Sequence, residues 1–241
     1  MKYKLNFSYD GTNYFGYAKQ VDKITLQEEV ETKLSKILNS KIKIYASGRT
    51  DKKVHAIEQV ADFTIDKDID CNKLKIQLNK ILNDDIHINN IEKVSEEFSS
   101  RFSAKKKTYI YIINPAEPTP FLRNYEFFEN RIDLNKIKEC LSLFKGKHNF
   151  QNFTSKESDE DNFIRTIYDF KILVRNGKYI FKITGNGFMK YMVRKIIGVL
   201  IEIGKGNLTK EFIKENLDVT SRNIVTYTAE PQGLYLLKIY Y

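Results

Sequence analysis

The chain has 241 residues, 41% of them hydrophobic and 13% aromatic, which allows a substantial buried core and excludes wholesale disorder. Lysine and arginine number 40 against 31 acidic residues, so the net charge of +9 favours an acidic partner such as a nucleic acid. No apolar run approaches the roughly eighteen residues of a membrane span, and the first residues open a strand instead of a signal peptide. We therefore expect a cytoplasmic protein with no membrane partner.

The first half of the chain predicts the order strand, helix, strand, strand, helix, strand. Strands are expected over 2–8, 41–45, 59–65 and 86–94 from their apolar alternation. Helices are expected over 25–38 and 71–82, and Thr25 and Glu28 have the spacing of a capping box at the first of them. This order is that of a ferredoxin-like unit, so we expect residues 1–104 to form an N-terminal subdomain.

The second half predicts another α/β subdomain, over 105–241. A strand over 108–113 places Tyr109 and Tyr111 on one face. Asp133 is placed to cap a helix that closes at Gly146, and Asn176-Gly177 is the strongest short signal for a hairpin, between strands over 165–174 and 179–184. Residues 188–203 have the wide apolar stripe of a helix, and 237–241 end the chain as a strand.

Positive charge is grouped in three stretches that lie far apart in the sequence. Residues 32–57 contain seven basic residues and one acid, whereas 101–116 and 171–201 contain four and seven basic residues and no acid. If folding brings the three stretches together, they form a cationic trough suited to a phosphate backbone. The alternative is an ordinary solvated, lysine-rich surface.

The single acid of the first basic stretch, Asp51, is the candidate reacting group. It lies in a loop that begins at Gly48, where a predicted strand ends, and loops leaving a sheet often bear reacting groups. The alternative is that Thr50 and Asp51 form a turn or a helix cap. A second candidate is Arg194, at the edge of an apolar helix face, where a guanidinium requires a carboxylate or phosphate partner. A purely structural ion pair is its alternative.

The string Gly48-Arg49-Thr50-Asp51, followed by Val54-His55-Ala56, resembles the signature loop of the tRNA pseudouridine synthase A (TruA) family, G-R-T-D-A-G-V-H-A. Further segments resemble that family's motifs in the right order, at residues 9–11, 98–104, 108–111, 165–167, 188–198 and 229–236. The chain departs from the family at Tyr17, at Thr108 and at Lys52-Lys53, which replace a small pair. If the place of the glycine requires a positive φ, Lys53 adopts it at a steric cost.

The resemblance implies an isomerase, an intramolecular transferase that converts uridine to pseudouridine at positions 38, 39 and 40 of the tRNA anticodon stem-loop. It implies a homodimer that requires no cofactor and no metal, and His55, His87 and His148 show no metal-ligand spacing. The implied fold is α+β: the pseudouridine synthase fold, with two ferredoxin-like (RRM-like) subdomains of mainly antiparallel sheets joined around a central basic cleft.

The resemblance also implies roles for individual residues. Asp51 is the nucleophile, Arg194 pairs with it, and Tyr109 stacks on the target base and is a candidate to accept its proton. The implied substrate-binding residues are Arg49, Tyr109, Gly233, Leu234, Lys105, Lys106, Lys107 and Lys190.

Two other functions compete with this one. A noncatalytic RNA-binding module would use the basic trough alone, with Asp51 as a cap. A metal-dependent phosphodiesterase would use Asp10, Asp51 and Asp62, although the basic stretches contain no cluster of acids.

Overall fold

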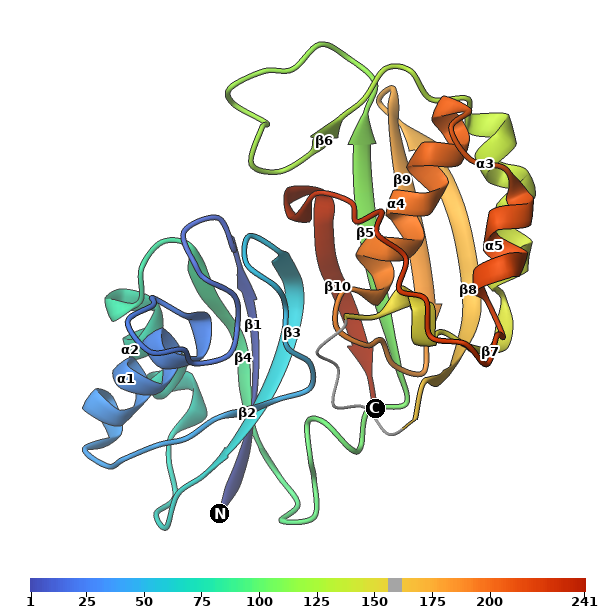
Figure 1. Cartoon of the computed structure of the whole chain (residues 1–241). Coiled ribbons are helices and arrows are strands. Elements are labelled where there is room, and N and C mark those ends of the chain that lie inside the picture. The colour runs from blue at the N-terminus through green and yellow to red at the C-terminus, as the bar shows by residue number, and fades with distance from the viewer. Residues whose placement is uncertain (156–161) are drawn as a thin grey trace. The chain divides into compact units, whose positions relative to one another are not determined.

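The computed structural model describes residues 1–155 and 162–241, which divide into two compact units (Figure 1). The first unit comprises Met1–Lys105 and Tyr235–Tyr241, and the second comprises Lys106–Leu234. The sequence placed the division after residue 104 and the last strand in the second subdomain, whereas the last strand groups with the first unit. Within the described residues, no helix has the length and apolar character needed to cross a membrane.

The first unit is a ferredoxin-like sheet with two helices on it. Its strands stand in the order β4-β1-β3, and β2 and β10 share the other edge of β3, with β10 parallel to β3 and the remaining pairs antiparallel. Figure 1 shows α1 and α2 next to each other in this unit. The elements are β1 (Lys2–Tyr9), α1 (Leu26–Leu38), β2 (Tyr45–Ala46), β3 (His55–Thr64), α2 (Cys71–Ile81), β4 (Ile86–Val94) and β10 (Leu234–Tyr240).

The register of the central strands determines where the loops of the first unit meet. Alternate residues of β1 are buried, from Tyr3 to Tyr9, so this strand runs through the core. The last residue of β1, Tyr9, pairs with Ala56 near the start of β3. As a result, the loop after β1 and the loop before β3 leave the sheet at the same end.

Two local predictions in the first unit are wrong, for identifiable reasons. The helix begins at Leu26, but the Thr25 hydroxyl is fully buried and accepts no hydrogen bond from the helix, so no capping box forms. The predicted strand over 41–45 is reduced to β2. Glu31 accepts the backbone N–H of Ile44 at 2.8 Å, and Ser35 accepts that of residue 42 at 2.9 Å. These side chains of α1 therefore take donors that a strand ladder would use.

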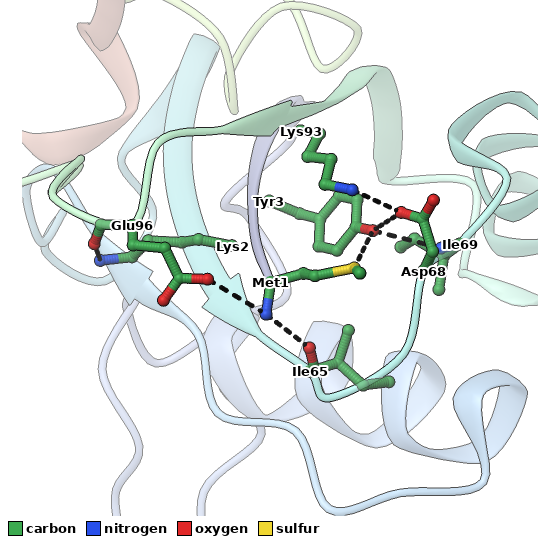
Figure 2. A network of polar contacts seen from close by, with 8 residues as sticks. All are labelled: Met1, Lys2, Tyr3, Ile65, Asp68, Ile69, Lys93 and Glu96. Carbon is green, nitrogen blue, oxygen red and sulfur yellow. Dashed lines mark hydrogen bonds and ion pairs between the residues drawn. The ribbon is translucent and has the colours of Figure 1, made fainter.

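The N-terminus is fixed to the sheet by a polar network (Figure 2). The ammonium group of Met1 lies 3.4 Å from a carboxylate oxygen of Glu96, and Tyr3 donates its hydroxyl hydrogen to Asp68 at 2.7 Å. Lys93 also donates to Asp68, at 2.9 Å. The hydrogen bond from Tyr3, together with the charge of Lys93, holds the pKa of Asp68 below its usual value, so its contribution to stability is lost as the pH falls through that lowered pKa.

The second unit is another mainly antiparallel sheet, with strand order β5-β9-β8-β7 and β6 parallel to β5. Its helices α3, α4 and α5 lie on one side of this sheet (Figure 1). The elements are β5 (Lys106–Asn114), β6 (Phe127–Phe128), α3 (Leu134–Cys140), β7 (Gly146–Asn149), β8 (Ile164–Arg175), β9 (Lys178–Gly185), α4 (Met192–Lys205) and α5 (Lys210–Asn216), with short 3-10 helices at Leu141–Phe144, Gln151–Phe153 and Pro231–Gly233. The expected α+β class is confirmed.

Backbone φ angles explain why one predicted turn of the second unit forms and why one predicted helix begins later than expected. Asn176 and Gly177 have φ of 50° and 74°, the left-handed pair of the predicted hairpin between β8 and β9. The helix predicted from residue 188 begins only at Met192, because Tyr191 has a φ of 64° and cannot continue a right-handed helix. Gly146 opens β7 and does not close α3, which ends at Cys140.

Candidate active site

The loop over 48–54, here called the Asp51 loop, is held at its base by three hydrogen bonds. The hydroxyls of Tyr9 and Thr50 lie 2.7 Å apart, and the backbone N–H of Tyr17 donates to the Thr50 carbonyl at 3.0 Å. Gln59 donates to the carbonyl of Gly48 at 2.9 Å. Asp51 itself is partly exposed. Its position is therefore set by a fixed loop that extends from the rigid sheet.

The tip of the Asp51 loop is a turn closed by backbone atoms. The N–H of Val54 donates to the carbonyl of Asp51 at 3.1 Å, and Lys53 has a φ of 64°. No helix begins in this loop, so Asp51 does not cap one, and the backbone turn leaves the role of its carboxylate a prediction. The expected positive φ at Lys53 is confirmed, in the place where the family signature has glycine.

Replacing Lys53 with glycine is expected to stabilise the protein. A left-handed φ destabilises a residue with a Cβ by about 1–2 kcal/mol, and glycine removes this strain. Glycine also loses more conformational entropy on folding, which costs about 0.5–1 kcal/mol, so the net gain in stability is about 0.5–1 kcal/mol. Urea denaturation measures the change in the free energy of unfolding. Lys53→Ala is the matched control because it removes the same charge but keeps Cβ. Equal stability of the two variants would contradict the prediction.

Glycines let the loop over 10–25 approach the Asp51 loop closely. A Cβ on Gly11 would lie 2.1 Å from the carbonyl oxygen of Val54, and Gly16, with a φ of 101°, would place one 3.0 Å from the Thr50 carbonyl oxygen. The N–H of Gly11 also donates to Nδ1 of His55 at 3.1 Å, and the His55 ring stacks on Tyr235 with centroids 4.6 Å apart. The Asp51 loop is thus enclosed by backbone on one side.

Gly11→Ala is expected to destabilise the protein and to displace the Asp51 loop. The new methyl group would overlap the backbone carbonyl of Val54, and because the position of Cβ is fixed by the backbone of residue 11, no rotamer change relieves the clash. We expect a loss of about 1–3 kcal/mol of unfolding free energy, as in other overpacked sites. Gly187→Ala is the control, since its Cβ would meet nothing closer than 3.9 Å. Identical melting temperatures for the two variants would show that the contact is not as close as described.

Arg194 lies in the first turns of α4 and is bonded to the segment that follows α5. Its Nε donates to the carbonyl of Ala229 at 2.8 Å, and the N–H of Ala229 donates back to the Arg194 carbonyl at 2.9 Å. The guanidinium carbon is 5.2 Å from the centre of the Tyr191 ring. Gly198, one turn on, allows this approach, because a Cβ there would be 2.8 Å from backbone atoms of Tyr227. These contacts fix the direction of the Arg194 side chain.

A cavity of about 490 Å³ lies beside Arg194 in the second unit. Its lining includes Ser155, Tyr191, Lys195 and Val225. Lys195 is buried, although it follows Arg194 directly, and its ammonium group donates to the carbonyl of Val225. The cavity therefore has two cationic side chains in its wall.

The predicted base-binding residues of the second unit lie on the strand β5 or next to it. Tyr109 is 8% exposed and meets the ring of Phe188 edge-on, with centroids 5.2 Å apart. Burial raises the pKa of the neighbouring Tyr111, an effect that the charge of Arg194 partly offsets. Gly233 packs against the Tyr111 ring, where a Cβ would be 2.8 Å from Cζ. Tyr111, Arg194 and Gly233 therefore belong to one neighbourhood.

The predicted site residues are divided between the two units. Asp51, Arg49 and Lys105 belong to the first, whereas Tyr109, Arg194, Gly233, Leu234, Lys106, Lys107 and Lys190 belong to the second. Arg49, Lys105, Lys106 and Lys190 are exposed, Lys107 is half-buried and Leu234 is buried. The roles assigned to them by resemblance remain predictions at this point.

The carboxylates of the phosphodiesterase alternative have other uses in the first unit. Asp62 is 3% exposed, accepts the backbone N–H of Ser100 at 2.7 Å and lies 3.5 Å from the ammonium group of Lys2. Asp10 accepts the N–H and hydroxyl hydrogen of Thr12. In the parts of the chain that the structure describes, no three histidine, cysteine, aspartate or glutamate side chains gather as a metal site would require.

A family model described as tRNA pseudouridine synthase matches residues 6–103 and 141–241, which cover most of the chain. This match places the protein in a class of isomerases, the pseudouridine synthases. Within that class, the chain belongs to the tRNA pseudouridine synthase family, as its motifs predicted.

Its relatives are similar along their whole length. The tRNA pseudouridine synthase A of Malacoplasma penetrans (strain HF-2) is 39% identical over 244 residues, covering 100% of both chains. The enzyme of the same name from Geobacillus sp. (strain WCH70) is 39% identical over 241 residues, with 99% of this chain and 97% of the relative covered. That from Pseudothermotoga lettingae is 37% identical over 235 residues, covering 96% of each.

Proposed function

We propose that this protein converts uridine to pseudouridine at positions 38, 39 and 40 of the tRNA anticodon stem-loop, with Asp51 as the nucleophile. The observation that supports this best is the geometry of the Asp51 loop. It presents one partly exposed carboxylate between the exposed cations Arg49 and Lys52, on a turn that hydrogen bonds hold to the sheet. A fixed anion in cationic surroundings suits a nucleophile that acts on RNA.

The reaction exchanges one glycosidic bond for another. The bond from N1 of uracil to C1′ of the ribose breaks, the base turns, and a bond from C5 to C1′ forms. C5 loses its proton, and N1 gains one. Asp51 would attack either C1′ or C6 and leave again, which divides one difficult step into two easier ones. The exchange is redox-neutral and needs no cofactor.

The other residues would prepare the nucleotide for this exchange. Arg194 would pair with Asp51, its direction set by the hydrogen bond from Nε to Ala229. Tyr109 would stack on the uracil near C5, with Gly233 and Leu234 next to the base. Arg49 would enter the RNA helix in place of the extruded nucleotide, because an enzyme acting on a paired base must take it out of the stack.

The tRNA would be bound mainly through its backbone and shape. Lys105, Lys106, Lys107 and Lys190 would contact phosphates, since an RNA duplex hides its base edges in a deep groove. Affinity should fall steeply as salt rises. We further propose that the protein acts in the cytoplasm as a homodimer whose two subunits share one tRNA.

Mapping pseudouridine on tRNA treated with the pure protein tests this function. Carbodiimide adducts on pseudouridine stop reverse transcription, so we expect new stops at positions 38, 39 and 40 wherever these are uridines. A tRNA with cytidines at the three positions is the control and should show none. Stops confined to another arm would overturn the proposed positions. The absence of any pseudouridine would overturn the activity and favour the noncatalytic RNA-binding alternative.

A further inference from the structure

Two lysines converge on one aromatic ring beside the Asp51 loop. The ammonium nitrogen of Lys52 lies 4.0 Å from the centroid of the Phe15 ring, and that of Lys23 lies 4.8 Å from it. The Phe15 side chain is 37% exposed, and both lysines are exposed. Lys52 directly follows Asp51, whereas Phe15 and Lys23 come from the loop after β1.

The position of the Phe15 ring is set by backbone contacts. Its N–H donates to the carbonyl of Ile24 at 2.9 Å, and its carbonyl accepts from the side-chain amide of Gln20 at 2.7 Å. The next residue, Gly16, approaches the Asp51 loop so closely that a Cβ would lie 3.3 Å from the backbone nitrogen of Lys52. The convergence of ring and lysines therefore follows from how the two loops pack.

This arrangement brings like charges together on an exposed surface. The face of the ring is negative and attracts an ammonium group, which reduces the freedom of the lysine without neutralising its charge. An ammonium group has three N–H donors, so one that rests on a ring retains donors for an anion. A phosphodiester group, with one negative charge and several acceptor oxygens, suits two ammonium groups held in this way.

We propose that Phe15, Lys23 and Lys52 form a phosphate clamp, which binds one backbone phosphodiester of the RNA next to the nucleotide that Asp51 attacks. The proposal rests on the proposed function for the identity of the RNA. It assigns a role to Lys52, which stands where the family signature has a small residue. Phe15 acts as a positioning residue that holds the lysines.

The salt dependence of tRNA binding tests the lysines. The dissociation constant of wild type, Lys52→Ala, Lys23→Ala and the double variant would be measured with unmodified transcript tRNA at several KCl concentrations. Loss of the single clamped phosphate in the double variant should reduce the slope of log affinity against log salt by about 0.7–0.9, and each single variant should reduce it by part of that amount. Binding should weaken by about 3–10-fold at low salt. Lys80→Ala, an exposed lysine of α2, removes the same charge and should leave the slope unchanged.

Variants of Phe15 test the role of the ring. Phe15→Leu should weaken binding by about 2–5-fold with an unchanged melting temperature, and Phe15→Tyr, which keeps a ring, should not. In the variant that lacks both lysines, adding Phe15→Leu should not change the dissociation constant for tRNA further. The clamp is overturned if Lys52→Ala has the slope of wild type, or if Phe15→Leu weakens binding equally with and without the lysines.

Failure of the clamp and failure of the proposed function give different results. The clamp is measured by binding alone, and pseudouridine by mapping on the same tRNA. If wild type forms pseudouridine and the lysine variants have the wild-type salt dependence of binding, the clamp is rejected and the proposed function is retained. If wild type forms no pseudouridine and the lysine variants show a weaker salt dependence of binding, the proposed function is rejected and the clamp remains as a contact to RNA.

Discussion

Replacing Asp51 by alanine is expected to abolish pseudouridine formation and leave tRNA binding intact. The carboxylate is the only group in the proposed mechanism that can form the covalent intermediate, so the rate should fall on the order of 10⁴-fold or more. Affinity for tRNA should stay equal or rise slightly, because the variant removes a negative charge from a cationic loop. Single-turnover mapping of pseudouridine and a binding titration give the two readouts.

The control for this variant is Asp66→Ala, which removes an exposed carboxylate of the same unit outside the Asp51 loop. It should form pseudouridine at the wild-type rate. If Asp51→Ala still modifies tRNA at a rate near that of wild type, Asp51 is not the nucleophile. If it loses tRNA binding together with activity while remaining folded, the loop serves binding and the proposed chemical role is wrong.

The second large effect is expected for Arg194→Lys, although this substitution keeps the charge. Lysine has no Nε–H to donate to the Ala229 carbonyl, and its ammonium group lacks the planar fork that matches a carboxylate. Breaking the proposed pair with Asp51 would cost about 3–5 kcal/mol, which corresponds to a fall in kcat of about 10²–10⁴-fold. Steady-state kinetics over a range of tRNA concentrations up to saturation measure this fall.

The kinetic pattern of the Arg194 variant distinguishes two roles. A fall in kcat with little change in KM supports a partner of Asp51, whereas a rise in KM at constant kcat would make Arg194 a phosphate contact and refute the pairing. Arg175→Lys, at the exposed end of β8, is the matched control and should change neither constant.

The sequence predicted the elements best where the local pattern and the tertiary structure agree. The strand over 86–94 has the predicted bounds, and Asn176-Gly177 forms the predicted turn because both positions require a left-handed backbone. The strand over 41–45 is reduced to β2 because Glu31 and Ser35, side chains of the preceding helix, bond to its backbone. No alternation of apolar residues can reveal such a competitor.

The candidate site was predicted from motifs, and its surroundings were not. The residues around Asp51 predicted the loop, and the apolar stripe of the predicted helix put Arg194 at the edge of its apolar face. Nothing in the local pattern indicated that Lys195 would be buried and would donate to Val225, in the segment that follows α5. The convergence of Lys23 and Lys52 on Phe15 was missed for the same reason. Contacts between loops distant in sequence depend on packing, which a single sequence does not display.

An isomerisation that depends on Asp51 can be measured by the release of tritium from tRNA labelled at C5 of uridine. Pseudouridine has a carbon bond at C5 in place of the hydrogen, so each conversion must send one tritium to water. We expect wild type to release about one tritium per modified uridine with no change in RNA length, and Asp51→Asn to release none. Shortened RNA, or equal tritium release by the variant, would contradict it.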